Sequence, residues 1–126
     1  MAERYSETAL DHFQNPRNVG GFDHPDAIGQ ATNPATGAVM EIHLKVDASR
    51  VVEARFSAQG CTATIAAGSM LTEMLSGRSV EDLRITTEEV DDALGGLPPT
   101  RRHAARLAAD AMSSALRAMG SKLPAG

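Results

Sequence analysis

The sequence predicts an α+β domain in which helices cover one face of a three-stranded antiparallel sheet. Residues 38–46 and 51–58 each alternate apolar and polar side chains, and the short segment Asp47–Arg50 between them is typical of a hairpin turn. After Gly60 the apolar residues recur at helical spacing, and such patterns continue to residue 119. A helix, three strands and then several helices in this order are typical of an α+β domain.

The elements before the hairpin follow from apolar spacing and from turn residues. A helix over residues 5–14 is predicted by apolar side chains at helical spacing: Ala9, Leu10 and Phe13. It ends before Pro16, because the residue before a proline avoids the helical region. Residues 17–33 are rich in Gly, Asn, Asp and Pro, and they predict a loop that leads into an edge strand around Ile28–Thr32.

The alternation in the hairpin predicts which side chains face the core. On residues 38–46 they are Met40, Ile42, Leu44 and Val46, and on residues 51–58 they are Val52, Ala54, Phe56 and Ala58. The other face of the sheet is expected to meet water.

The helices after the hairpin have clear start and stop signals. The segment Cys61–Ser76 is rich in Ala and ends at Gly77. Capping-box spacing predicts two short helices, one beginning at Ser79 and one at Thr86. A Gly- and Pro-rich break then precedes the last helix, residues 101–119, which carries an apolar stripe.

Composition limits the class of protein. The 126 residues, of which 42% are hydrophobic, predict a single domain with a core over about residues 5–119. Only 3% are aromatic, so the core is expected to consist of aliphatic residues, Met and Ala. The net charge of −4 argues against a general nucleic-acid binder. The sequence has neither a membrane-spanning apolar stretch nor a signal-peptide pattern, and we expect a cytoplasmic protein with no membrane partner.

Cys61 is the single cysteine and the first candidate for chemistry. One cysteine excludes an intramolecular disulfide and any Cys-rich metal motif carried by this chain alone. It follows Gly60 where a strand gives way to a helix, and a thiol at a helix N-terminus is favoured as thiolate. The alternative is that Cys61 is a small buried residue without chemistry.

His103, at the start of the last helix, is the second candidate, as a neutral ligand-competent imidazole. The alternative is a partly exposed polar residue. The other histidines are expected to have surface roles: His12 on the solvated face of the first helix, His24 in a loop and His43 on the polar face of a strand.

Four stretches resemble one known family, in the same order and at similar spacing. They are Tyr5–Gly20 (with Asp11-His12-Phe13 and Asn15-Pro16-Arg17-Asn18-Val19-Gly20), Asn33–Met40, Gly60–Ala66 and Leu97–Ala104. On these motifs the chain, from about Tyr5 to about Met119, resembles the IscU/NifU N-terminal domain family of iron–sulfur cluster assembly scaffolds. The resemblance implies one IscU/SufE-like domain over residues 1–126 and a role as a scaffold or carrier, not an enzyme.

The resemblance also implies a site. In the family, three cysteines, a histidine and an aspartate surround the cluster. Cys61 and His103 match two of these positions, whereas Thr36 and Ala104 stand where the family has cysteine and Ala38 where it has aspartate. A cluster or a zinc ion takes four protein ligands, so one chain offers Cys61 and His103 for iron, a cluster or another metal but not a full set.

Three functions remain open at this point. The first is a divergent or accessory member of the iron–sulfur assembly machinery, with a cluster or metal shared between two chains of a homodimer. The second is a SufE-like carrier that holds persulfide sulfur on Cys61. The third is a non-catalytic module that binds a cysteine desulfurase or a true scaffold. In each case the expected partners are a cysteine desulfurase or other iron–sulfur assembly proteins, and the resemblance adds a chaperone contact at Leu97–Thr100.

Overall fold

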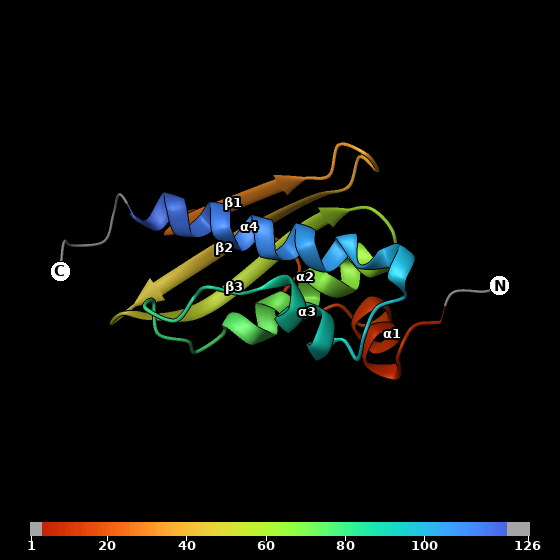
Figure 1. Ribbon diagram of the computed structural model, residues 1–126. Coiled ribbons are helices and arrows are strands. Elements are labelled where there is room, and N and C mark those ends of the chain that lie inside the picture. The colour runs from red at the N-terminus through yellow and green to blue at the C-terminus, as the bar shows by residue number, and fades with distance from the viewer. Residues whose placement is uncertain (1–3, 121–126) are drawn as a thin grey trace.

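The computed structural model describes residues 4–120, and they form one sheet with helices packed on it (Figure 1). In chain order the elements are α1 (Glu7–Gln14), β1 (Ala27–Thr32), β2 (Val39–Asp47), β3 (Arg50–Gln59), α2 (Thr62–Leu75), α3 (Thr87–Ala93), the 3₁₀ turn η1 (Pro99–Arg101) and α4 (His103–Gly120). The strands are antiparallel in the order β1-β2-β3. This confirms the predicted α+β class. Within residues 4–120 no helix is long and apolar enough to span a bilayer.

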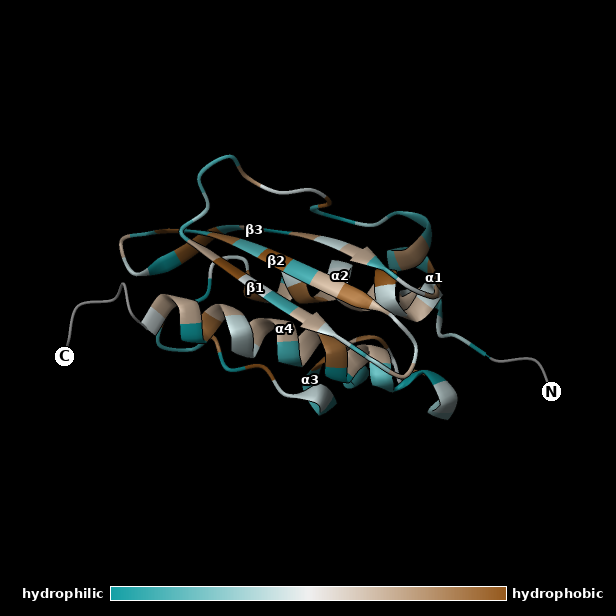
Figure 2. Ribbon diagram, turned by 90° about the horizontal axis from the view of Figure 1, so that it is seen from above, coloured by the Kyte–Doolittle hydropathy of each residue, from teal (hydrophilic) through white to brown (hydrophobic). Residues whose placement is uncertain are grey.

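Helices α2, α3 and α4 lie on the same side of the sheet (Figure 2). The core between them is aliphatic, as the composition predicted, with Phe56 as its one fully buried aromatic ring among the described residues. Two glycines permit close packing. A Cβ on Gly29 of β1 would lie 2.1 Å from the Ala111 carbonyl oxygen of α4, and one on Gly68 of α2 would lie 2.3 Å from the Phe56 ring.

The segment between α1 and β1 protects the outer edge of β3. The Phe56 N–H donates to the Asn18 carbonyl oxygen (2.9 Å), and the Gly20 N–H donates to the Phe56 carbonyl oxygen (2.8 Å). An unpaired edge strand invites association with other strands, and these bonds satisfy part of that edge within the chain.

The predicted inward face of β3 is wrong at Val52, which is 56% exposed. The pairing shifts at a β-bulge, because Lys45 is opposite Glu53 but the next residue, Val46, is opposite Val51. Val52 is therefore the extra residue, and Val51 takes the buried position in its place. A bulge changes which face a residue occupies, and simple alternation cannot reveal it.

The helix predicted to begin at Ser79 is absent from the structure. Ser79 instead forms an isolated antiparallel bridge with Arg50, and its carbonyl accepts the Asp82 N–H in a tight turn (2.9 Å). The second predicted capping box is confirmed. At the start of α3 the Thr86 side chain accepts the Glu89 N–H, and the Glu89 side chain accepts the Thr86 N–H. The same spacing thus opens a helix only where the following residues continue it.

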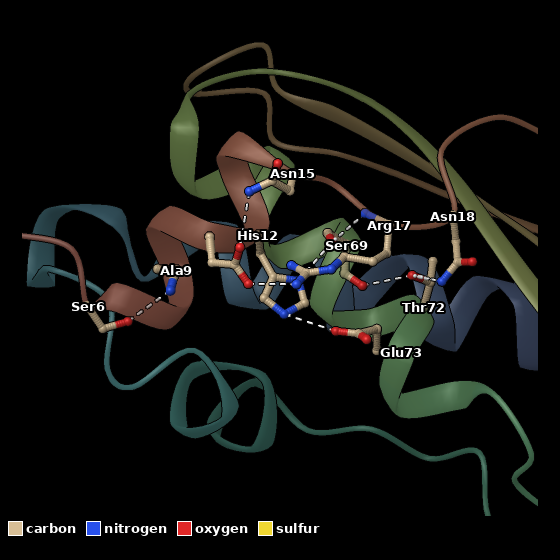
Figure 3. Close-up of polar contacts among 10 residues, drawn as sticks. Ser6, Ala9, His12, Asn15, Arg17, Asn18, Ser69, Thr72 and Glu73 are labelled. Atoms are coloured by element: carbon tan, nitrogen blue, oxygen red, sulfur yellow. Dashed lines mark hydrogen bonds and ion pairs between the residues drawn. The ribbon is translucent and has the colours of Figure 1, made fainter.

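His12 is buried, which corrects the expectation of a solvated position (4% exposed). It faces α2 together with Ala9, whereas Leu10 and Phe13 are 38% and 40% exposed. Its Nε2–H donates to Glu73 Oε1 (3.0 Å), so in the neutral ring Nδ1 accepts from the Ser69 hydroxyl (2.7 Å; Figure 3).

The same serine also holds the chain after α1. The Arg17 N–H donates to Ser69 Oγ (2.9 Å), and the Asn18 amide donates to Thr72 Oγ1 (3.1 Å; Figure 3). These bonds and the His12 contacts together fasten α1 and residues 17–18 to one face of α2.

The other two histidines predicted to have surface roles lie where the sequence placed them. His24 is exposed in the loop before β1. His43 is on the polar face of β2, but the loop covers it: Nδ1 accepts the Phe22 N–H (3.2 Å) and Nε2 contacts Glu41 Oε1 (2.6 Å).

We predict that the protein loses stability in mild acid because of His12. Burial lowers the pKa of His12 and the nearby positive charge of Arg17 lowers it further, while Glu73 and Asp11 raise it less. The unfolded chain therefore takes up this proton at a higher pH than the folded chain. The free energy of unfolding should fall as the pH decreases through about 6.5, the usual value for histidine.

Urea unfolding at a series of pH values measures this effect. His12→Gln should flatten the dependence between about pH 7.5 and about pH 5.5, the range in which histidine titrates. His24→Gln, at an exposed site, is the matched control and should leave the slope unchanged. An identical slope in the wild type and in His12→Gln would contradict the assignment.

Candidate functional site

Three segments meet at one end of the molecule: the loop between β1 and β2, the junction of β3 with α2, and the start of α4 (Figure 1). They enclose a pocket of about 250 Å³, called here the Cys61 pocket. Its lining residues are Thr36, Ala38, Gly60, Cys61, Thr64, Arg101 and His103. The structure therefore brings together four of the five positions that the sequence singled out. The fifth, Ala104, is fully buried and does not line the pocket.

Cys61 is the N-cap residue of α2 and is half-buried. Its backbone is extended (φ −81°, ψ 178°), and its carbonyl oxygen accepts the Thr64 N–H (3.0 Å). Its Sγ lies 3.6 Å from Thr64 Oγ1. The thiol thus occupies the N-cap position beside the first turn of α2, and its side chain makes no capping hydrogen bond to the helix backbone.

The surroundings of Cys61 favour the thiolate. Burial raises the pKa of the thiol, but the hydrogen bond from the Thr64 hydroxyl, the backbone N–H groups of Thr64 and Ala63, and the charge of Arg101 outweigh burial. The pKa of Cys61 is therefore lower than that of an ordinary cysteine. This agrees with the interpretation of Cys61 as a chemically competent thiol at a helix N-terminus.

The Thr36 side chain stabilises the turn between β1 and β2. Its Oγ1 accepts the Ala38 N–H (3.2 Å), and the loop closes where the Asn33 N–H donates to the Ala38 carbonyl oxygen (2.8 Å). Gly37 has a φ of 76°, which favours glycine. The Thr36 hydroxyl is thus part of the turn, and a neutral hydroxyl is a poor ligand for iron or zinc.

Asp91 positions the segment that leads into α4. Its Oδ1 accepts the Leu97 N–H (2.8 Å), and its Oδ2 lies 3.5 Å from Arg102 Nε. Leu97 and Pro98 are buried as a result, whereas Pro99 and Thr100 are exposed. This segment brings Arg101 and then His103 into the lining of the Cys61 pocket.

The ligands in the pocket do not fit a cluster or zinc bound by one chain. Within residues 4–120, no three His, Cys, Asp or Glu side chains come together in a geometry that could hold a metal ion. The Cys61 pocket offers one thiol and one imidazole, where a cluster needs four ligands.

Comparison with known proteins gives the family. The family model described as the NifU-like N terminal domain matches residues 4–123. The chain belongs to this family. It is 46% identical over 113 residues to the iron-sulfur cluster assembly scaffold protein IscU 1 of Archaeoglobus fulgidus, covering 89% of this chain and 74% of that one. It is 39% identical over 123 residues to IscU of Escherichia coli, covering 94% and 95% of the two chains.

Solved structures support the same fold. The N-terminal part of a nitrogen-fixing NifU-like protein from Brucella abortus superposes with a TM-score of 0.74 over 94% of this chain and 95% of that one, at 18% identity. The NifU-like fold is therefore present here, and relatives of 39–46% identity are named scaffolds. The Cys61 pocket of this chain contains one cysteine and one histidine.

Thr64, which lines the Cys61 pocket, is not among the site residues predicted from the sequence. Thr64 is three residues after the N-cap, the position whose backbone and side chain face the capping group, so the spacing from Cys61 contained the signal. The lowering of the Cys61 pKa by the charge of Arg101 could not be predicted from local spacing, because Arg101 lies 40 positions later in the chain.

We predict that Thr64→Val raises the pKa of Cys61, because it removes the hydroxyl that donates to the thiolate and keeps the volume of the side chain. The rate of alkylation by iodoacetamide, followed against pH, should reach its midpoint at a higher pH than in the wild type, and the rate at neutral pH should fall. Thr62→Val, in the same turn but not lining the pocket, is the control. An unchanged midpoint in Thr64→Val would show that the hydroxyl does not stabilise the thiolate.

Proposed function

We propose that this NifU-like protein is an accessory member of the iron–sulfur assembly machinery that accepts sulfur on Cys61 as a persulfide. The observation that supports this most is the placement of one thiol at the N-cap of α2, with its pKa lowered and its sulfur facing a pocket. A thiolate is the form that attacks a sulfur–sulfur bond. A cluster bound by one chain would need ligands that Thr36, Ala38 and Ala104 do not provide.

The sulfur transfer needs a persulfide donor but no separate oxidant or reductant. The Cys61 thiolate attacks the outer sulfur of a persulfide on a cysteine desulfurase, the donor's sulfur–sulfur bond breaks, and the donor cysteine leaves as a thiolate. One sulfur–sulfur bond forms and one breaks, so there is no net oxidation. The N–H groups and the Thr64 hydroxyl that favour the Cys61 thiolate would also stabilise the anionic persulfide.

The proposal includes partners and a compartment. The donor would be a cysteine desulfurase, and the recipient another iron–sulfur assembly protein. A chaperone contact at Leu97–Thr100 would begin at the exposed Pro99 and Thr100, and it would have to release Leu97 and Pro98 from burial. A reducing cytoplasm suits a protein that works through a single thiol.

A second candidate is a cluster shared by two chains, each giving Cys61 and His103. One observation favours it: both residues line the same pocket, so a homodimer that faces the two pockets together would offer two thiolates and two imidazoles. Clusters with two Cys and two His ligands are chemically known. The third possibility, a purely non-catalytic binding module, is less well supported, because such a module has no need of a stabilised thiolate.

We expect Cys61 to acquire radioactive sulfur from labelled L-cysteine in the presence of a cysteine desulfurase, and Cys61→Ser to lose the label. The control is the double variant Cys61→Ser/Ser113→Cys, which presents one thiol on the exposed face of α4 away from the pocket. It should not regain the label at the wild-type rate. Equal labelling of Cys61→Ser and wild type would refute the carrier function.

Anaerobic reconstitution with iron and sulfide distinguishes the second candidate. A shared cluster would give visible charge-transfer absorption and a dimer, and both should be lost in Cys61→Ser and in His103→Ala. We expect neither signal in the wild type if the protein acts as a sulfur carrier. A stable, coloured dimer would favour the shared cluster instead.

A further inference from the structure

A second pocket lies beside the Cys61 pocket, and the proposed function does not use it. It has a volume of about 370 Å³, and we call it the Arg106 pocket. Its lining residues are Thr32, Asn33, Pro34, His103, Arg106, Leu107 and Asp110. His103 lines both pockets, so the two pockets adjoin at its imidazole.

The two charged side chains of this pocket, Arg106 and Asp110, form only a long and exposed ion pair. Arg106 and Asp110 are one turn apart on α4, with side chains 77% and 58% exposed and 3.8 Å between Nε and Oδ2. Such an exposed pair contributes little to stability, so its charges can be redirected to a ligand at small cost. A guanidinium and a carboxylate this close together match the carboxylate and the ammonium of an amino acid.

The size and the remaining walls suit a small ligand. A volume of about 370 Å³ is near the lower end of the range of small-molecule pockets, about 300–1,000 Å³. Pro34 and Leu107 add apolar surface to the lining that holds the charged pair and His103. The space is therefore adequate for an amino acid or a short peptide.

We propose that the Arg106 pocket binds a small zwitterionic thiol, of the kind represented by free cysteine. Its carboxylate pairs with Arg106, its ammonium with Asp110, and its thiol lies at His103 facing Cys61. This inference rests on the proposed function, because it supplies an acceptor for the sulfur that Cys61 carries.

Atoms and electrons balance in the transfer of sulfur from Cys61 to the bound thiol. The bound thiol loses its proton to solvent, and the resulting thiolate attacks the outer sulfur of the Cys61 persulfide. The bond between Cys61 Sγ and that sulfur breaks, and Cys61 leaves as a thiolate, stabilised again by Thr64. The product is the persulfide of the small thiol. No oxidant or reductant is consumed.

Binding is tested without any sulfur transfer. Cys61→Ser is titrated with S-methyl-L-cysteine, and the backbone amide NMR signals of Asn33, Arg106 and Asp110 are followed. We expect saturable shifts at millimolar ligand. Analogues that lack the ammonium or the carboxylate should bind about tenfold more weakly, as the loss of one charge-assisted hydrogen bond implies.

Matched variants locate the site. Arg106→Gln should weaken binding of S-methyl-L-cysteine by about tenfold on the same reasoning. Arg117→Gln, on an exposed turn of the same helix that lines neither pocket, should bind like the parent protein. The absence of saturable shifts, or equal binding of all three ligands, would overturn the site.

Transfer is tested on the wild type loaded with persulfide sulfur and then freed of small molecules. The rate of discharge should saturate as L-cysteine is increased, and Arg106→Gln should restore a linear dependence without affecting loading. A linear dependence in the wild type would overturn the acceptor role. If S-methyl-L-cysteine binds but Cys61 never carries sulfur, the proposed function and the acceptor role both fail, and the amino-acid site stands by itself.

Discussion

The close packing of α4 on β1 at Gly29 is the constraint on which the rest of the structure depends. A Cβ on Gly29 would lie 2.1 Å from the Ala111 carbonyl oxygen, so only glycine permits the helix backbone to approach the strand this closely. With so few aromatic residues, the core gains its density from short distances between backbones and from aliphatic side chains. This contact sets the position of α4, and therefore of His103 at its first turn, relative to the end of the sheet where Cys61 lies.

The walls of the site are held by the fold itself. The loop that contains Thr36 closes with its hydroxyl bonded to the Ala38 N–H, and Ala104 is buried in the core. Cys61 has the features that a helix N-terminus gives to a thiol, because these depend on backbone N–H groups and on Thr64. One thiolate suffices for sulfur transfer, whereas a cluster needs several ligands at once.

Polar side chains hold the segments that surround the site. Ser69 joins α1 to α2 through His12 and also accepts the Arg17 N–H, and Asp91 holds the chain before α4 through the Leu97 N–H. These are buried or half-buried bonds, in which a lost partner would leave a polar group unsatisfied. The regular elements give the domain its shape, and these bonds decide how the irregular segments lie on it.

Local patterns in the sequence determined the class of fold, the hairpin, the main helices and the position of Cys61 at the start of a helix, because hydrophobic period and helix start signals act over a few residues. Tertiary structure alone decided the rest. The bulge that exposes Val52 depends on how β3 pairs with β2, and the burial of His12 and the absence of a helix at Ser79 depend on a partner helix or strand distant in the chain. The two pockets that meet at His103 arise in the same way, since their walls come from segments that only the packing of α2 and α4 on one sheet brings together.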